Sequence, residues 1–495
     1  MPKPATRALI VGASVVGLLL LLRRRRQRRL AARLASLVKL SLLPSERGPL
    51  LCMSPATSTV TFFRGRPYVA AASLSRRVHQ IVAANPWLTS VLERDPDSGL
   101  MEAYYYHQPS PKPCFEVRAD ILLASSAAYD EMVRIVDPVV CKTSDASLGT
   151  GERLWRVCLI PDADEPDGRF ALVVSANHSL LDGHGFYRLH TMLSAGAAVE
   201  ALNPVRKQEL PTRILQALGG EESVMTVCPP GFLARFLFGQ LRGALFPSTV
   251  HLGFHVDEEW VAARKAEETR GDSFGTIADG VRLQEMRERQ MRYARGRPVA
   301  LRCRTAHVPP QVPFLSTNDV LVSAFLSALK CRCAMMAINF RGKVTGCGEA
   351  DAGNYEDLMT YMPPDYATPS LIRRSVTGRG GVYTRAAEPR TAQLTNAEHL
   401  MGGTYGAVTN WASFAKALSV DGCEAEYLHL PLFDFSKACP ACICGSMVIF
   451  RPGEGKSVAA MVAGSQALID AVKASGMVGL PLHLGTQRQR AGEGR

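Results

Sequence analysis

The order of hydrophobic and polar positions predicts a chain that contains both strands and helices. Short apolar runs between turn residues are typical of buried strands, and longer stretches with helical spacing are typical of helices. We expect strands at 101–106, 115–121, 154–160, 170–176 and 446–450, and one ending at Asn339. We expect helices at 73–84, 185–192 and 317–330, and a charged one at 284–295. The pattern therefore predicts an α/β protein without internal repeats.

The 495 residues are too many for one small domain and predict either more than one domain or one large two-lobed unit. Residues 50–202 and 299–480 carry the strongest strand and helix patterns and should form the N-terminal and C-terminal lobes. Between them, 203–298 is broken by prolines and glycines and is predicted to be a crossover linker. Within this linker, 232–238 is apolar with an embedded arginine, which fits either a core helix or a membrane contact. Residues 481–495 form a polar tail.

The N-terminal region has the composition of a membrane anchor. Residues 8–22 carry no charge and, as a helix, would span about 22 Å, less than the roughly 30 Å hydrocarbon core. Six arginines within 23–29 follow, and the positive-inside rule places them and the rest of the chain in the cytosol. We expect 1–45 to anchor the protein in a membrane, most simply the endoplasmic reticulum. An organelle transit peptide is the alternative, since no acidic residue precedes Glu46.

Charge and cysteine content exclude some functions. The net charge is +12, but the arginine cluster supplies half of that surplus, and no nucleic-acid-binding motif accompanies it. We therefore predict a membrane surface, and no nucleic acid, as the partner of the basic segment. The 13 cysteines are scattered and odd in number, as free thiols in a reducing compartment would be. Cys439 and Cys442 form a C-x-x-C pair without a second pair at zinc-site spacing, so we read them as packed cysteines.

A metal site formed by histidines is also disfavoured. His178, His184 and His190 recur every six residues. On a strand this spacing separates neighbours by about 20 Å, and on a helix it turns each about 120° from the last. Neither arrangement converges on one ion, so we predict no metal and expect His184 and His190 to be packing or surface residues.

The candidate chemistry lies in the run Asn177-His178-Ser179-Leu180-Leu181-Asp182-Gly183, which directly follows the apolar segment 170–176. A neutral imidazole can remove a proton near pH 7, so His178 is the candidate general base. Asp182 could orient His178, or it could fix the loop through an arginine. Gly183 permits a tight turn and the close approach of a substrate.

This run resembles the H-x-x-x-D-G signature of the coenzyme A-dependent acyltransferase superfamily. That superfamily includes chloramphenicol acetyltransferase, the plant BAHD acyltransferases, wax ester synthases and the condensation domains of peptide synthetases. The likeness covers most of the chain after about residue 55. It is supported by segments 85–88, 154–157 and 316–321. The resemblance implies an α/β, two-lobed chloramphenicol acetyltransferase-like sandwich with a central tunnel, here preceded by the anchor helix.

The resemblance also implies roles for residues of the second lobe. Asn339-Phe340-Arg341-Gly342-Lys343, followed by Gly353-Asn354, is similar to the BAHD segment whose arginine pairs with the motif aspartate. This makes Arg341 the structural partner of Asp182. Thr409-Asn410-Trp411 resembles the segment in which a hydroxyl and an indole help to hold the oxyanion, which assigns catalytic roles to Thr409 and Trp411.

Two positions depart from the pattern of the relatives. Asn177 stands where many relatives have a second histidine, and the BAHD D-F-G-W-G motif is present only as Asp434-Phe435-Ser436-Lys437. The second departure places membership of the BAHD branch proper in doubt. It does not exclude activity, because the role of that motif in relatives is structural.

The implied activity is transfer of an acyl group from an acyl-CoA donor to an alcohol or amine acceptor, lipophilic if the anchor holds the chain at a membrane. Coenzyme A thioester would be a co-substrate, with no other cofactor, and the protein would act as a monomer. We expect a ternary complex without an acyl-enzyme, in which His178 acts directly on the acceptor. The alternatives are a carrier-protein-dependent condensation enzyme that makes amides or esters, and a catalytically inactive, membrane-tethered acyl-CoA-binding protein.

Overall fold

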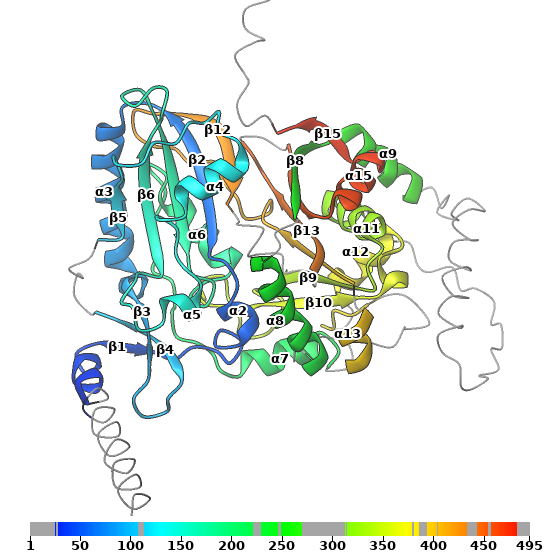
Figure 1. Ribbon diagram of the computed structural model, residues 1–495, viewed down its shortest axis with the longest axis horizontal. Coiled ribbons are helices and arrows are strands. Elements are labelled where there is room, and N and C mark those ends of the chain that lie inside the picture. The colour runs from blue at the N-terminus through cyan, green and yellow to red at the C-terminus, as the bar shows by residue number, and fades with distance from the viewer. Residues whose placement is uncertain are drawn as a thin grey trace, which may run out of the picture.

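The computed structural model describes residues 25, 28–106, 113–220, 229–245, 249–269, 312, 314–378, 381–385, 394–402, 404–432, 443–453 and 457–482. In this part of the chain the strands form three sheets, with five, seven and three strands. The five-stranded and seven-stranded sheets are the centres of two lobes that lie side by side (Figure 1). The predicted two-lobed α/β architecture is therefore present.

The N-terminal lobe is built on the five-stranded sheet, with strand order β12-β2-β7-β6-β5. The strands are β2 (Thr57–Arg64), β5 (Phe115–Val117), β6 (Trp155–Pro161), β7 (Arg169–Ala176) and β12 (Glu424–Pro431). β7 is the central strand and is buried along almost its full length, which explains its continuous apolar sequence. Its one interior polar residue, Ser175, exchanges a hydrogen bond with Ser58 (2.8 Å) and accepts one from the Cys141 amide (2.8 Å). β7 therefore ends rigidly at the H-x-x-x-D-G motif.

The other elements of this lobe support one face and one end of the sheet. The long helix α3 (Pro67–Ala84) packs on β5 and β6. It begins six residues earlier than the sequence pattern predicts, because Pro67 occupies its first turn, where a missing N–H costs nothing. The three-stranded sheet is formed by β1 (Val38–Leu40), β3 (Val91–Arg94) and β4 (Met101–Tyr105). The short elements are α2 (Pro49–Cys52), η1 (Pro86–Thr89), α4 (Tyr129–Val136), α5 (Ser144–Ser147) and α6 (Gly183–Met192).

The C-terminal lobe is built on the seven-stranded sheet, with order β10-β9-β11-β13-β14-β8-β15. Its strands are β8 (Val250–Val256), β9 (Cys333–Asn339), β10 (Glu356–Tyr361), β11 (Tyr405–Asn410), β13 (Ile443–Phe450), β14 (Ala459–Gly464) and β15 (Val478–Pro481). β11 runs parallel to both of its neighbours, while the other pairs are antiparallel. The sheet is therefore mixed.

Helix α11 (Thr317–Leu329) packs on the C-terminal sheet and contacts α9 (Glu258–Thr269), α12 (Pro369–Thr377) and α15 (Gln466–Ala474). Its start is set by a capping box in which Ser316 accepts from the Asp319 amide while Asp319 accepts from the Ser316 amide. Lys330 ends the helix in the left-handed conformation, with φ of 53°. The sequence prediction of 317–330 is confirmed to within one residue. The remaining elements are η2 (Pro363–Tyr366) and α13 (Asn396–Gly402).

Two strands differ from the predicted division of the chain. Residues 250–256 fall within the predicted linker 203–298, but they form β8 and pair with β14 and β15 inside the C-terminal sheet. β12 comes from the second half of the chain but pairs with β2 at the edge of the N-terminal sheet (Figure 1). The linker prediction was wrong for β8, because its partner strands lie some two hundred residues later and leave no local signal. β12 joins the lobes through shared sheet hydrogen bonds.

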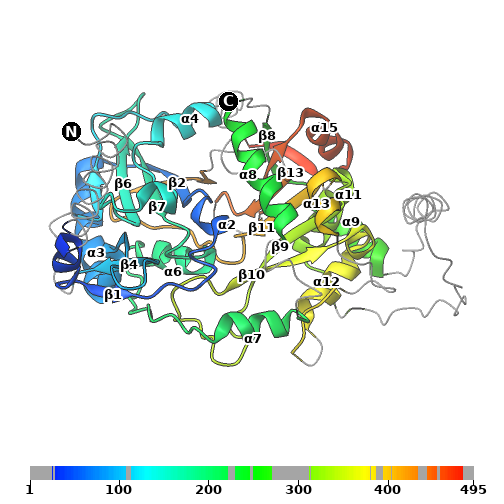
Figure 2. The ribbon, with the colours of Figure 1, turned by 60° about the horizontal axis from the view of Figure 1, so that its bottom comes forward.

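Helices α7 (Leu210–Ala217) and α8 (Pro230–Leu245) make up much of the remaining crossover. In α8, Phe232 and Phe236 are buried against Met335 and Tyr405 of the C-terminal sheet and against α2 of the N-terminal lobe. Figure 2 shows α8 lying next to α2 and the strands of the C-terminal sheet. The apolar segment 232–238 is thus a helix with a core-facing side. Its membrane contact stays a prediction, with Phe238 66% exposed on the other side.

Several predicted features lie outside the described residues. They are the apolar run 8–22, the charged stretch 284–295, the Asp434 to Lys437 segment, Cys439 and Cys442, and the tail beyond residue 482. Among the residues that are described, no helix is long and apolar enough to cross a membrane.

Candidate active site

The motif loop connects the C-terminal end of β7 to the N-terminus of α6. Asp182 is the N-cap of α6, and its Oδ1 accepts a hydrogen bond from the Gly185 amide (2.8 Å). At the other end of the loop, the buried Asn177 amide donates to the Lys142 carbonyl (2.9 Å) and accepts from the Ser179 amide (2.9 Å). Asn177 therefore braces the start of the motif loop.

The predicted contact between Asp182 and Arg341 is present. Arg341 Nη1 donates to Asp182 Oδ2 (2.6 Å), and both side chains are fully buried. Arg341 also donates to the Asp351 carbonyl from Nε (2.9 Å) and to the Gly353 carbonyl from Nη2 (2.9 Å). Asp182 Oδ2 in addition accepts from the Tyr355 amide (3.0 Å). Because these donors occupy both carboxylate oxygens, Asp182 ties the motif to the second lobe and does not hydrogen-bond His178.

The electrostatics of Asp182 agree with a structural role for this residue. Burial would raise the pKa of Asp182, but the charge and hydrogen bonds of Arg341, with those of two amides, outweigh it and hold the pKa below its usual value. Asp182 is therefore an anion at neutral pH and completes a buried ion pair.

His178 itself is half-buried at the end of β7. Burial lowers the pKa of its imidazole, and the nearby Asp182 charge opposes this only in part. The backbone carbonyl of His178 accepts a hydrogen bond from Asn354 Nδ2 (2.8 Å), which fixes the residue against the second lobe. Its Nδ1 is buried and, within the described residues, has no hydrogen-bond partner. The imidazole is therefore neutral near pH 7 and able to accept a proton.

A buried network that the sequence did not reveal holds the motif loop from behind. Glu46 Oε1 accepts from the backbone amide (2.9 Å) and the side chain (3.1 Å) of Asn354, and Oε2 accepts from Arg206 Nε (3.1 Å). Arg206 Nη2 donates to the Leu180 carbonyl (2.7 Å), and the Ser179 hydroxyl donates to the Glu46 carbonyl (2.7 Å). Partners up to 308 positions apart in the chain meet here, so no local pattern could have identified Glu46 or Arg206.

Trp411 is also brought to the motif. Its indole Nε1 lies 3.5 Å from the position that a Cβ on Gly183 would occupy, so the glycine lets the ring approach the start of α6. The Trp411 amide donates to the Ile449 carbonyl (2.8 Å), which fixes the segment that follows β11. Thr409 is half-buried near the end of β11, two residues before Trp411. The oxyanion roles of both residues stay predictions.

The three histidines of the motif region lie in different surroundings. His184 Nε2 contacts the Glu349 carbonyl (3.2 Å), whereas His190 is buried with its ring 5.0 Å from that of His429. Within the described ranges, no group of three or more potential ligands could hold a metal. His190 is therefore a packing residue, which is one of the two alternatives, packing or surface, that the sequence predicted for it.

The buried pair His190 and His429 predicts acid sensitivity. Burial, and the neighbouring His429, lower the pKa of His190 well below its usual value, and burial lowers the pKa of His429 to about 4. The unfolded chain therefore binds protons first as the pH falls below 6.5, so stability decreases from there down to the folded-state pKa. We expect His190→Phe to reduce the loss of unfolding free energy between pH 6.5 and 5 by about 2 kcal/mol.

Denaturant unfolding at the two pH values measures this effect. The control is His79→Phe on the exposed side of α3, which should leave the acid-induced loss unchanged. An equal acid-induced loss in wild type and His190→Phe would contradict the assignment.

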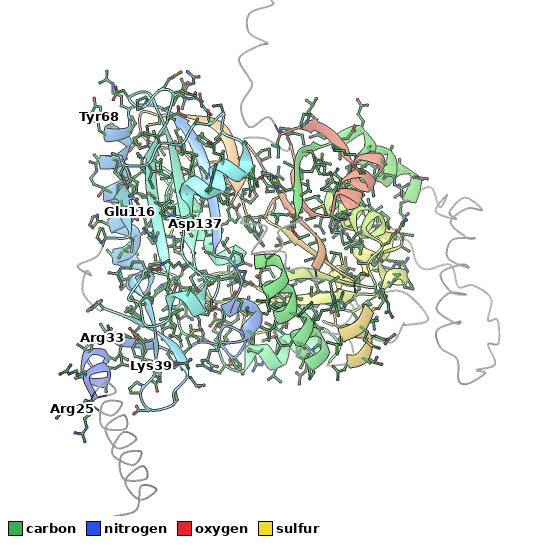
Figure 3. The ribbon with its side chains drawn as sticks, viewed as in Figure 1. Arg25, Arg33, Lys39, Tyr68, Glu116 and Asp137 are labelled. Atoms are coloured by element: carbon green, nitrogen blue, oxygen red, sulfur yellow. The ribbon has the colours of Figure 1, made fainter. Side chains whose placement is uncertain are left out.

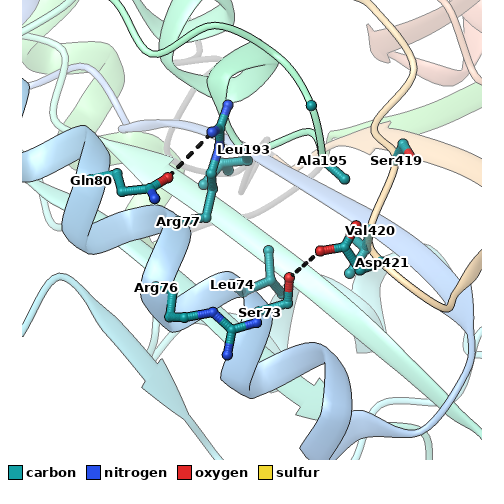
Figure 4. Close-up of a pocket in the computed structure, with 11 residues that line it drawn as sticks. Ser73, Leu74, Arg76, Arg77, Gln80, Leu193, Ala195, Ser419, Val420 and Asp421 are labelled. Carbon is teal, nitrogen blue, oxygen red and sulfur yellow. Dashed lines mark hydrogen bonds between the residues drawn. The ribbon is translucent and has the colours of Figure 1, made fainter.

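One surface cavity lies away from this site. It has a volume of about 160 Å³ and lies between α3, the loop after α6 and the segment around Val420 (Figure 4). Ser73 donates to Asp421 across it (2.8 Å), and Arg77 spans it towards the Met192 carbonyl. His178 is not among its lining residues, so the central tunnel stays a prediction.

Comparison with known proteins shows the fold but no related sequence. No family model matches, and no curated protein matches. TRI101 of F. graminearum, solved with coenzyme A and T-2 mycotoxin, has a TM-score of 0.52 at 12% identity, covering 88% of this chain and 97% of its own. The first condensation domain of the calcium-dependent antibiotic synthetase, solved with a substrate analogue, has a TM-score of 0.50 at 13% identity, covering 90% and 98%.

The chain shares the fold of TRI101 and of this condensation domain. This agrees with the resemblance carried by the H-x-x-x-D-G motif. At such low identity, the likeness establishes the fold, and the activity has to be argued from the site.

Proposed function

We propose that this protein is an acyltransferase that moves an acyl group from an acyl-CoA thioester to a hydroxyl or amine acceptor. The observation that carries the proposal is the state of His178. Its imidazole is half-buried, is kept neutral by burial, and donates no hydrogen bond to Asp182, whose oxygens accept from other donors. A neutral imidazole at a lobe junction suits a general base.

The reaction would proceed in one ternary complex. His178 removes the proton of the acceptor as its oxygen or nitrogen attacks the thioester carbonyl, and a tetrahedral oxyanion forms. Thr409, with Trp411, would stabilise that oxyanion. Collapse of the intermediate breaks the C–S bond, and His178 returns the proton to the thiolate of coenzyme A. Asp182 and Arg341 act by fixing the loop and take no proton.

Release of free thiol from a panel of acyl-CoA donors tests the proposal. The full chain is incubated with donors of several lengths, with and without short and long alcohols and amines. Thiol release that requires an acceptor supports acyl transfer. A donor that binds but is never consumed with any acceptor would contradict it, and would favour a binding protein on the same scaffold.

A carrier-protein donor is the second candidate, because the similarity to a condensation domain is nearly equal to that to TRI101. An acyl-CoA and an acyl carrier protein present the same pantetheine arm and differ in the group attached to it. A comparison of acyl-pantetheine with acyl-CoA as donors therefore distinguishes the two functions. A much higher kcat/KM with acyl-CoA favours the acyltransferase, and equal values favour a carrier protein.

We further propose that residues 1–45 attach the protein to a membrane, with the catalytic body in the cytosol at the endoplasmic reticulum. Arg25, Arg33 and Lys39 lie together at one end of the N-terminal lobe, and Tyr68 lies at the opposite end (Figure 3). Lys39 is paired with Asp95 (2.5 Å), whereas Arg25 is exposed and could meet anionic lipid.

The full chain should float with vesicles of phosphatidylcholine and phosphatidylserine in a density gradient. Placing two charges in the apolar run, with Leu19→Asp and Leu20→Asp together, should abolish flotation, because each aspartate opposes insertion by about 2.5–3.5 kcal/mol. Tyr68→Asp, at a side chain that is 67% exposed, is the control and should float as wild type does. Flotation of the double variant at the wild-type level would contradict the anchor.

A further inference from the structure

Glu356 is the first residue of β10 and lies on the face of the C-terminal sheet that is turned towards the N-terminal lobe. Two residues earlier, Asn354 reaches across to the His178 carbonyl. Two residues later, Leu358 packs against the cluster that contains Phe232 and Phe236 of α8. Because alternate residues of an extended chain share a face, Glu356 lies between the His178 loop and α8. Tyr355 points the other way, into the core behind the sheet.

This inter-lobe face is partly open near Glu356. Ala337 on β9 and Ala407 and Thr409 on β11 share the face and are half-buried. Their neighbours Met336 and Val408, which point to the opposite side, are buried in the core. The strands next to His178 are therefore less completely covered on the side where a substrate would have to lie.

The Glu356 carboxyl is unusual among the acidic groups around the site. Asp182 and Glu46 are each held by an arginine and by backbone amides. Within the described residues, Glu356 has neither a hydrogen bond nor an ion pair, although it is half-buried. A carboxyl on this face that no protein group engages is available to hydrogen-bond a molecule that binds between the lobes.

The protonation state of the Glu356 carboxyl limits which chemical groups could bind to it. Burial, followed by the charge of Asp182, raises the pKa of Glu356 to about 8, and Arg341 offsets this only in part. Near neutral pH the group is therefore a neutral carboxylic acid, which can both donate and accept a hydrogen bond. Such a group suits a neutral oxygen-bearing partner better than an ammonium ion, whose binding requires the ionised form.

We propose that Glu356 determines acceptor specificity by hydrogen-bonding a second hydroxyl of the acceptor, separate from the hydroxyl that His178 deprotonates. The inference rests on the proposed acyl transfer and names its substrate class, a vicinal diol or similar polyol. The preference is expected to appear in KM, because this hydroxyl takes no part in the bond changes and is held equally in the ground state and the transition state.

Kinetics with 1-octanol and 1,2-octanediol as acceptors test the proposal on the full chain. We expect wild type to prefer the diol by about tenfold in kcat/KM, the size of one good hydrogen bond. Glu356→Gln, whose amide still donates and accepts, should keep the preference. Glu356→Leu should lose it, with little change for 1-octanol.

Asp357→Asn is the matched control, since Asp357 is on the same strand and its carboxyl already accepts from the Leu358 amide (2.7 Å). This variant should keep the wild-type preference. A wild type without preference, or a Glu356→Leu variant that retains it, would overturn the proposal. So would a stronger preference for 2-amino-1-octanol that Glu356→Gln loses, which would indicate an ammonium site. If no variant acylates any alcohol or amine while wild type also fails, the proposed acyl transfer itself is wrong.

Discussion

Replacing His178 with alanine is expected to lower kcat by about 10² to 10⁴ while leaving KM for the acyl-CoA donor nearly unchanged. The imidazole takes the acceptor proton only as the transition state forms, so its loss removes an interaction that the ground state lacks. The fold should survive, because the motif loop is held by Asn177, Asp182 and the Glu46 network and not by the imidazole. The measurement is acceptor-dependent thiol release, with circular dichroism to confirm folding.

The pH dependence provides a second readout on the same variant. Burial lowers the pKa of His178 below its usual value of about 6.5. The wild-type kcat/KM should therefore be level near pH 7 and fall only at more acidic pH, where the base becomes protonated. The residual activity of His178→Ala should lack this limb. His79→Ala, at an exposed histidine of α3, is the control and should behave as wild type. Equal turnover by wild type and His178→Ala would overturn the base assignment.

Replacing Asp182 with alanine is expected to lower the free energy of unfolding by about 3–5 kcal/mol. The substitution leaves the Arg341 guanidinium fully buried without its counter-charge, and it leaves the amides of Gly185 and Tyr355 without their acceptor. Asp182→Asn should cost less, because its oxygen can still accept one of these bonds. The double variant Asp182→Ala, Arg341→Met should recover part of the loss, because no unpaired charge remains.

Guanidinium unfolding at pH 7.5 measures these differences. The matched control is Asp120→Ala, because Asp120 pairs with Arg118 on the surface (2.8 Å) and exposed pairs contribute about 0–1 kcal/mol. Two results would contradict a structural role for Asp182. One is an Asp182→Ala variant as stable as the control, and the other is a variant of normal stability that has lost only catalysis.

Local sequence was sufficient for the elements that carry the motif. The apolar run 170–176 predicted β7, and the pattern of 185–192 predicted α6, which begins two residues earlier, at Gly183, with Asp182 as its N-cap. Ser316 and Asp319 are three residues apart and set the start of α11 through a local capping box. These features could be predicted because their hydrogen bonds and side-chain periods join residues within a few positions of one another.

The pairing of Asp182 with Arg341 could not be predicted from local sequence. The two residues are 159 positions apart, and nothing in either segment points to the other. The prediction came from the resemblance of 339–343 to a family segment, and the contact in the structure agrees with it.

Only the tertiary structure decided what surrounds the motif. Glu46 and Arg206 brace the loop from segments that carry no motif, and β8 and β12 take their places by pairing with distant strands. Glu356 became notable because no group in the described part of the chain pairs with it on the inter-lobe face. In each case the free energy comes from contacts across the fold, and strand pairing or a buried ion pair depends on which segments meet. The sequence by itself determined where His178 sits and what could precede and follow it. The packing of the two lobes determined that Asp182 faces Arg341, and that burial keeps the His178 imidazole neutral.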